Sequence, residues 1–344
     1  MVDFRSIPRA LLDSMCSGSA YLFVGAGFSK NATNGNKYLD SNELAEELLA
    51  RVPSSLLQDP PLDDGSFMAA TAAYESAYSL ELLHYEICSI LPEIDEPGDC
   101  HRLLMLFPWR RIYTTNYDLL LENADPARAL SVEDDRQLTD NRRGSKKLVI
   151  KLCGDRNHIT YMRATKERLE LSSLEREIPK ICEELLLHLG EAPFIFIGYN
   201  MDDNFLQLGR SFAKRKAERE QVPYPTSFLL NWNLTKEALK RFRELGLTVI
   251  DLKVYGFGPN KTVAFKDFLQ AALKYCNQWD RRYIPSQQPP QPRIFGVFRS
   301  RQVTIPQPET TELEKSAYPW SDAEDVPIIV ASTKGKRSQE ILEQ

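Results

Sequence analysis

The sequence predicts an α/β fold in which a parallel β-sheet is covered by helices on both faces. Short apolar runs typical of buried strands alternate with longer segments of helical spacing. Three of these runs end in small or polar residues: 21–24 precedes Gly-Ala-Gly, 112–115 precedes Asn-Tyr-Asp, and 194–197 precedes Gly-Tyr-Asn. Ligands of open parallel sheets bind beyond the carboxyl ends of the strands, so we expect these loops to meet at one crevice.

Composition indicates a soluble globular protein with a substantial core. The 344 residues are 42% hydrophobic and 26% charged, and the net charge of −5 gives no general attraction to nucleic acids or anionic membranes. No apolar run approaches the roughly 20 residues that span a bilayer, and the N-terminus lacks a signal-sequence pattern. We therefore expect a cytoplasmic protein with no membrane contact and no direct nucleic-acid binding.

The cysteines do not indicate a metal site. Six are present, widely spaced and without a Cys-x-x-Cys pair, at positions Cys16, Cys88, Cys100, Cys153, Cys182 and Cys276. This pattern argues against a zinc ribbon or a dithiol redox motif. We expect no metal cofactor and an intracellular, reducing location.

The first third of the chain is predicted to be mostly helical. A short helix at about 8–16 leads into the strand at 21–24. A second helix, at 41–52, has Ser41 or Asp40 as its cap and Glu43 near its third position. After the proline-rich break at 53–61, helical spacing returns at 66–92 and 101–107. Together these segments predict a helical insertion over about 40–108.

The remainder alternates strands and helices. A polar, charged stretch at 125–145 is predicted to be a surface excursion. The predicted strands are 112–115, 148–152, 194–197, 227–230 and 248–252, and the predicted helices are 117–123, 174–190, 203–220, 235–245 and 261–276.

The composition changes after about residue 284. A run of glutamine and proline at 287–292 is typical of a stiff linker, and 293–344 holds two short β-like runs. This tail is too short for a robust core of its own. We therefore divide the chain into a main domain, 1–284, and a linker and tail, 285–344, suited to an oligomer or partner contact.

The loop after the first strand is suited to phosphate. Gly25 and Gly27 allow close approach of the backbone, Ser29 adds a hydroxyl, and a following helix N-terminus favours negative charge. A Gly-x-Gly after a strand is also often only a tight turn. Lys30 stands where the full dinucleotide fingerprint has a third glycine, which disfavours a hydride-transfer dehydrogenase.

Four segments, Gly-Ala-Gly-Phe-Ser at 25–29, Thr-Thr-Asn-Tyr-Asp at 114–118, Lys-Leu-Cys-Gly-Asp at 151–155 and Gly-Tyr-Asn-Met-Asp-Asp at 198–203, share a pattern with a known family. Their order and spacing over about 15–275 resemble the sirtuin-like (silent-information-regulator-like) NAD-binding domain. The resemblance is to the NAD hydrolases of bacterial antiphage defence systems in particular. It implies a Rossmann-like sheet and NAD as the substrate.

The resemblance also implies roles for individual residues. Asn116 matches the catalytic asparagine, and Asp118 matches the acidic residue near the nicotinamide. The first loop would bind the phosphates, the Gly-Tyr-Asn segment the adenosine half, and the residue after 227–230 a ribose. The implied cofactor contacts are Gly25, Ala26, Gly27, Phe28, Ser29, Thr115, Gly198, Tyr199 and Asn231.

One position departs from the family. The usual motif reads Lys-Leu-His-Gly, with the histidine as catalytic base, whereas this chain has Cys153. A thiol with an ordinary pKa of about 8.5 is mostly protonated at pH 7. Three readings follow: Cys153 is an activated thiolate, His158 serves instead, or the domain binds NAD and hydrolyses it slowly or not at all.

Each of these residues also has a plain structural explanation. Asn116 and Asp118 suit the start of a helix. Cys153 suits a small buried apolar position. His158 suits a surface loop, and Tyr199 suits the core.

The sequence thus predicts a cytoplasmic NAD glycohydrolase that releases nicotinamide and ADP-ribose in abortive-infection defence. The alternative is a scaffold that binds NAD or ADP-ribose with weak or no catalysis. Sirtuin deacetylases organise their peptide groove with a four-cysteine zinc module, which this sequence lacks, so deacetylation is disfavoured. Because such effectors are held silent until triggered, we expect a homo-oligomer, a sensor, motor ATPase or Argonaute-like partner, or both.

Overall fold

The computed structural model describes residues 7–56, 67–141, 145–158, 162, 164, 180–200 and 204–282. Its described part contains a seven-stranded sheet in the order β3-β4-β2-β1-β5-β6-β7, with every neighbouring pair parallel. The strands are β1 (Tyr21–Val24), β2 (Arg111–Thr114), β3 (Ala129–Val132), β4 (Lys147–Lys151), β5 (Phe194–Ile197), β6 (Ser227–Asn231) and β7 (Leu247–Asp251). The predicted α/β fold with a parallel sheet is confirmed.

The strand register places the starts of the three predicted loops next to one another at the same edge of the sheet. Val24, the last residue of β1, lies opposite Thr114 of β2 and Ile197 of β5. The segments beginning at Gly25, Thr115 and Gly198 therefore leave the sheet side by side at its carboxyl edge.

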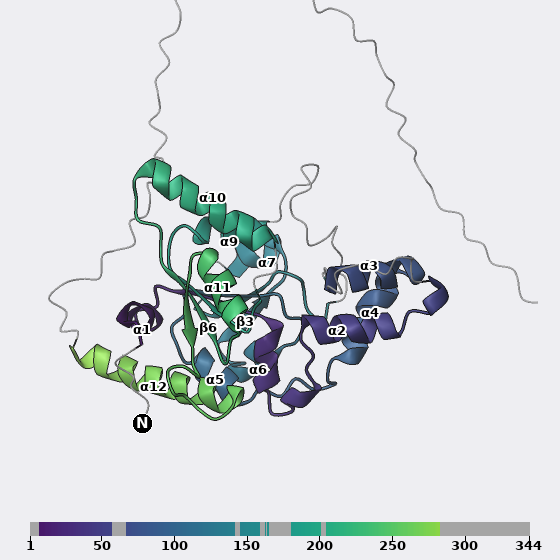
Figure 1. Ribbon diagram of the computed structural model, residues 1–344, viewed down its shortest axis with the longest axis horizontal. Helices are drawn as coiled ribbons and strands as arrows, with labels where there is room; N and C mark the ends of the chain where they lie inside the picture. The colour runs from purple at the N-terminus through teal and green to yellow at the C-terminus, as the bar shows by residue number, and fades with distance from the viewer. Residues whose placement is uncertain are drawn as a thin grey trace, which may run out of the picture. The chain divides into compact units, whose positions relative to one another are not determined.

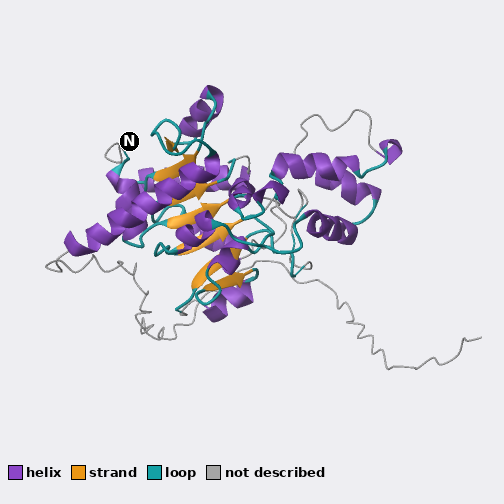
Figure 2. Ribbon diagram, turned by 90° about the horizontal axis from the view of Figure 1, so that it is seen from below, coloured by secondary structure: helices purple, strands orange, loops and turns teal. Residues whose placement is uncertain are grey.

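Alternation along β1 divides the core between the two faces of the sheet. Tyr21 and Phe23 belong to one buried apolar cluster, whereas Leu22 and Val24 belong to another. All four side chains are at most 1% exposed, as expected for a central strand covered on both faces. Figure 2 shows helices on both sides of the sheet.

The helices cover the two faces unequally. On the Leu22 face lie α1 (Arg9–Cys16), α5 (Asp99–Met105), α6 (Leu120–Ala124) and the long α12 (Lys261–Arg282) (Figure 1). The Tyr21 face is covered by α9 (Lys180–His188), α10 (Asn204–Glu220), α11 (Lys236–Glu244) and α7 (Asp135–Asn141).

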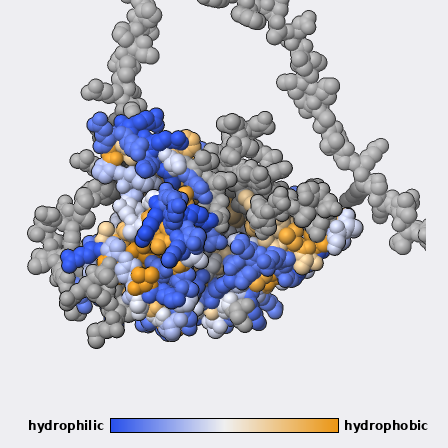
Figure 3. All heavy atoms as spheres, in the orientation of Figure 1, coloured by the Kyte–Doolittle hydropathy of each residue, from blue (hydrophilic) through white to orange (hydrophobic). Residues whose placement is uncertain are grey.

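The α-helices between β1 and α5 pack on the Tyr21 face as well. They include α2 (Ser41–Ala50), α3 (Phe67–Ala77) and α4 (Leu80–Ile90). Asp40 and Glu43 form the expected capping box at the start of α2. Leu82 and Tyr85 of α4 are exposed, and Figure 3 shows apolar side chains over α3 and α4.

Two sequence predictions are corrected. The stretch at 125–145 is not only a surface excursion, because it contains β3 and α7. β3 is a four-residue edge strand with two buried positions, so its apolar signal is weak. The segment at 66–92 is two helices, because Ser79 caps α4 through its side chain. The first residues of the helix predicted at 174–190, and the tail at 285–344, lie outside the described residues.

A disulfide joins two helices that are remote in the sequence. Cys16, at the end of α1, is bonded to Cys276 of α12, at a sequence separation of 260. Disulfides are uncommon in reducing compartments. In the described part of the chain, no helix combines the length and apolar character needed to cross a membrane.

His101 provides a pH-sensitive point in the core. Its ring is 1% exposed and lies edge-on to Phe28, with 4.8 Å between ring centroids. Burial, and then the charge of Arg102, lower the pKa of His101 to about 3. Between about pH 6.5 and 3, His101 is therefore protonated in the unfolded chain but neutral in the folded chain.

We predict that His101 destabilises the fold as pH falls from about 6.5 towards 3, by at most about 1.4 kcal/mol per pH unit. Urea unfolding of the wild type and His101→Leu between pH 4 and 7 measures this dependence. The free energy of unfolding should fall less steeply with acidification in the variant. Equal slopes would contradict the prediction, whatever the absolute stabilities.

Candidate active site

The loops after β1 and β5 are in direct backbone contact. The N–H of Gly25 donates to the Ile197 carbonyl and the N–H of Gly27 to the Gly198 carbonyl, both at 2.9 Å. A Cβ on Gly25 would lie 2.5 Å from the Gly198 oxygen, and Gly198 itself has φ +64°. These glycines are therefore required by the contact between the two loops.

This contact changes the expected role of the first loop. The N–H of Phe28 donates to the Gly25 carbonyl at 3.0 Å, so the N–H groups of Gly25, Gly27 and Phe28 are all engaged within the protein. They do not form the open phosphate cradle that the Gly-x-Gly pattern suggested. Half-buried Ala26 begins a short 3₁₀ helix, η2 (Ala26–Asn31), which carries Ser29.

The Phe28 ring, expected at the cofactor, instead anchors η2 in the core. It is fully buried and packs edge-on against Phe265 of α12, with 5.7 Å between centroids, as well as against His101. Any contact between Phe28 and a ligand would therefore involve its backbone.

Two lysines lie beside this loop. Lys30 forms ion pairs with Asp40 at 2.7 Å and Glu43 at 2.6 Å, so its charge is neutralised. Lys261, the first residue of α12, donates to the Gly27 carbonyl at 2.8 Å. Burial, and next the charge of Lys30, lower the pKa of Lys261. Among the described residues no carboxylate pairs with Lys261, which leaves it suited to an anion at this loop.

Asn116 and Asp118 meet Ser29 in a buried network. The Asn116 side-chain amide donates to Ser29 Oγ at 3.0 Å, and Ser29 Oγ donates to Asp118 Oδ2 at 2.7 Å. The backbone of Asn116 is held by Thr114, whose hydroxyl accepts its N–H at 3.0 Å. Asn116 Oδ1 is buried and has no hydrogen-bond partner among the described residues. It is thus an acceptor available to a hydroxyl or water at the carboxyl edge of the sheet.

Asp118 also supports the adjoining helix. Its Oδ1 accepts the N–H of Leu120, the first residue of α6, at 3.2 Å. The helix-start role considered from the sequence is thus present together with the contact to Ser29.

A buried lysine supports this network from the neighbouring strand. Lys151, the last residue of β4, is 1% exposed, donates to the Asp118 carbonyl and lies 3.5 Å from Glu122 Oε1. Burial lowers the pKa of Lys151, but the carboxylates of Glu122, Asp118 and Asp155 more than offset this and raise it overall. Lys151 therefore remains charged and fixes the loop that carries Asn116 and Asp118.

Cys153 lies in an apolar setting. It is 4% exposed and belongs to the core cluster that includes Tyr117 and Ile87 of α4. This environment matches the small buried apolar role considered from the sequence. Reactive thiols are typically more exposed than this one.

His158 is not an isolated surface residue. Its side chain is 54% exposed, but Nδ1 lies 2.7 Å from Glu133 Oε1 and 3.6 Å from Asp155 Oδ1. Burial, and next the Asp155 carboxylate, raise the pKa of Glu133 to about 7. The hydrogen bond from Arg156 N–H to the Tyr117 carbonyl, at 3.0 Å, ties this loop to the one after β2.

The other predicted contacts lie along the same edge of the sheet. Thr115 is half-buried directly after β2, and Gly198 directly follows β5. The Tyr199 ring packs on Phe23 with 4.6 Å between centroids, so it also belongs to the core. Asn231 ends β6, where its Oδ1 accepts the N–H of Trp232 at 2.8 Å.

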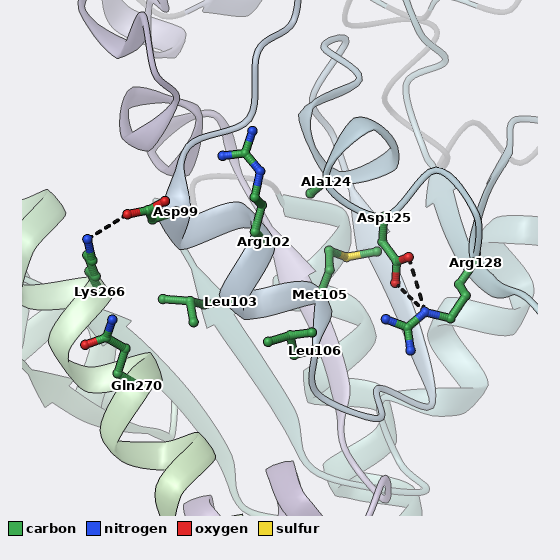
Figure 4. A pocket seen from close by; sticks show the side chains of 10 residues that line it. All are labelled: Asp99, Arg102, Leu103, Met105, Leu106, Ala124, Asp125, Arg128, Lys266 and Gln270. Atoms are coloured by element: carbon green, nitrogen blue, oxygen red, sulfur yellow. Dashed lines mark hydrogen bonds and ion pairs between the residues drawn. The ribbon is translucent and has the colours of Figure 1, made fainter.

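A separate cavity lies among the helices on the Leu22 face of the sheet. It has a volume of about 360 Å³, lies between α5, α6 and α12 and reaches Arg128, just before β3 (Figure 4). Its charged groups largely pair with one another, as Lys266 does with Asp99 at 2.6 Å and Arg128 with Asp125 at 3.0 Å. This cavity is not part of the candidate active site.

Sequence reasoning missed Lys151, Lys261 and Glu133. Lys151 lies in an apolar run that predicts a buried strand, and a buried lysine needs a charged or polar partner. Its role could therefore have been predicted from the sequence. The sequence did not indicate a role for the other two residues. Lys261 begins a helix that is distant in the sequence, and Glu133 follows a strand that was not predicted.

Comparison with known proteins identifies a family for part of the chain. Residues 110–250 match the family model of the SIR2-like domain, so the chain carries a sirtuin-like domain. Domains of this type bind NAD. The matched region contains Asn116, Cys153 and Gly198, whereas the loop at 25–29 lies before it. No curated protein sequence matches the chain.

We predict that Lys261→Met weakens binding of ADP-ribose, which contains the pyrophosphate of NAD but not its scissile bond, by roughly 10- to 100-fold. The variant loses the ammonium group beside the Gly27 carbonyl. Isothermal titration with ADP-ribose measures the Kd. Lys274→Met, at an exposed position on the same helix, is the matched control. A Kd unchanged in both variants would place the pyrophosphate elsewhere.

Proposed function

We propose that the sirtuin-like domain of this chain is an NAD glycohydrolase, which cleaves the nicotinamide–ribose bond to give nicotinamide and ADP-ribose. The observation that carries this proposal is the buried Asn116 amide. It is held by Ser29 at the point where β1 and β2 end, and its Oδ1 has no partner among the described residues. The match to the SIR2-like domain supports NAD as the substrate.

The proposed reaction breaks the bond from nicotinamide to C1′ of the ribose through an oxocarbenium-like state. Asn116 Oδ1 would accept a hydrogen bond from a ribose hydroxyl or from the attacking water. Because Ser29 and Thr114 hold Asn116 in place, little reorganisation is needed as the reaction proceeds. Lys261 would contact the phosphates.

The residue that would act as the catalytic base is the feature of this site that fits NAD cleavage least well. A base near the ribose hydroxyls typically contributes about 10²–10⁴-fold. Cys153 occupies its position and is buried in the apolar cluster. This observation favours a second candidate function, a scaffold that binds NAD or ADP-ribose with weak or no catalysis. His158, oriented by Glu133, is the alternative base.

The proposed biological role rests on the resemblance to the NAD hydrolases of antiphage defence systems. Depletion of NAD would halt metabolism, which suits an abortive-infection effector in antiphage defence that acts in the cytoplasm. Such an activity must be silent until triggered. We therefore propose control by homo-oligomerisation, by a sensor, motor ATPase or Argonaute-like partner, or by both.

Deacetylation fits the site less well. The zinc module of sirtuin deacetylases needs four clustered cysteines. Among the described residues, the one group of His, Cys, Asp and Glu side chains close enough to hold a metal contains no cysteine.

We expect Asn116→Ala to abolish nicotinamide release while ADP-ribose binding is largely kept, because the variant loses the catalytic acceptor but not Lys261. Chromatography of NAD, nicotinamide and ADP-ribose in reactions with purified protein measures this. Asn42→Ala, at an exposed position of α2, is the matched control. Turnover that survives in Asn116→Ala would contradict the assignment of the active site.

We expect Cys153→His to raise turnover, by roughly 10²-fold if a missing base limits the reaction, because an imidazole with a pKa near 6.5 accepts a proton at neutral pH. The same chromatographic assay measures it. Cys153→Ser, which removes the thiol without adding an imidazole, is the control. A loss of activity in both variants would show instead that the Cys153 thiol takes part in the reaction.

A further inference from the structure

The ends of β3 and β4 bring together three potential metal ligands. The two strands are parallel neighbours, with Val132 opposite Ile150, so the residues that follow them leave the sheet side by side. Glu133 directly follows β3, whereas Asp155 and His158 lie in the loop after β4. One carboxylate oxygen from each acidic residue and one ring nitrogen of His158 all lie within 4.8 Å of one another.

The local structure holds the Asp155 carboxylate in place. Its Oδ1 accepts the backbone N–H of Asn157 at 2.8 Å, and its Oδ2 accepts from the Ser131 hydroxyl on β3 at 3.4 Å. Asp155 is 1% exposed. It is therefore fixed against β3, beside Glu133.

The buried negative charge of this group is incompletely compensated. Glu133 is 3% exposed, and its Oε2 is buried without a hydrogen-bond partner among the described residues. In that same part of the chain, His158 is the one basic side chain within ion-pair distance of either carboxylate. The nearby Lys151 and Arg156 pair instead with Glu122 and Asp95. A buried carboxylate oxygen without a donor is unfavourable unless a proton or a cation accompanies it.

We propose that Glu133, Asp155 and His158 form a binding site for one divalent metal ion. Two carboxylates and one imidazole, with no thiolate, suit an ion that accepts oxygen and nitrogen ligands, such as Mn²⁺. Because His158 is half-exposed, the ion reaches the site from solvent, and water completes its coordination. The bound ion joins the end of β3 to the loop that carries Cys153, and thereby restrains that loop. This proposal does not depend on NAD cleavage.

Mn²⁺ titration of the full-length protein tests the proposal. The protein is treated with EDTA and desalted, and free Mn²⁺ is followed by electron paramagnetic resonance. We expect one saturable Mn²⁺ per chain, and a Kd at least about tenfold weaker in Glu133→Gln, which loses a charged ligand at unchanged size. Glu244→Gln, at an exposed position of α11, is the matched control and should bind as the wild type does.

A second variant covers the case in which Glu133→Gln fails to fold, as judged by circular dichroism. His158→Asn alters a half-exposed side chain and should weaken Mn²⁺ binding similarly. Absence of saturable binding in the wild type, or an unchanged Kd in the folded variants, would overturn the proposal. The three residues would then form an ion cluster within the protein only. The readout is metal binding alone, so an inactive enzyme would not affect the result.

Discussion

The Ser29 hydroxyl is the buried link on which the geometry of the candidate site depends. It accepts from the Asn116 amide at 3.0 Å and donates to Asp118 at 2.7 Å, so it joins the loops that follow β1 and β2. A buried polar group that loses its partner carries the full desolvation penalty, on the order of 1–3 kcal/mol. The three side chains therefore hold one another in a single arrangement, and that arrangement places Asn116 Oδ1 at the carboxyl edge of the sheet.

The position of this network is set by the backbone around it. On one side, the loops after β1 and β5 touch through Gly25 and Gly198, and any larger residue at Gly25 would separate them. On the other side, Lys151 reaches from β4 to the Asp118 carbonyl and stays charged because carboxylates surround it. A buried ammonium is costly without such partners, so Lys151 and the loop after β2 constrain each other.

Cys153 is the residue at which this site differs most from what the proposed NAD cleavage would need. The acceptor Oδ1 of Asn116 lies at the carboxyl edge of the sheet, where the proposed NAD cleavage would need it. Cys153, however, packs in a cluster shared with Tyr117 and with the helices inserted between β1 and β2. The Cys153 side chain is 4% exposed, and a thiol buried among apolar residues is a poor base. His158 and Glu133 provide acid–base groups on the adjacent side of the same loop.

The sequence by itself determined the fold class, most strands and helices, a cap at Ser41 or Asp40, and the loops that meet at the site. These features follow from local periodicity and from short motifs, which act over a few residues. It did not reveal β3, because that edge strand buries only two of its four residues. Because β3 was not predicted, the sequence did not indicate that Glu133 lies beside Asp155 and His158.

The tertiary structure decided which individual side chains and backbone groups of these and other distant segments are in contact. It engaged the N–H groups of Gly25 and Gly27 in a contact between loops, and it brought Lys261 to Gly27 across 234 positions of the chain. It also paired Cys16 with Cys276 and enclosed Cys153 in the core. The physical reason is that hydrogen bonding and burial depend on strand register and helix packing, which bring together residues whose separation in the sequence carries no periodic signal.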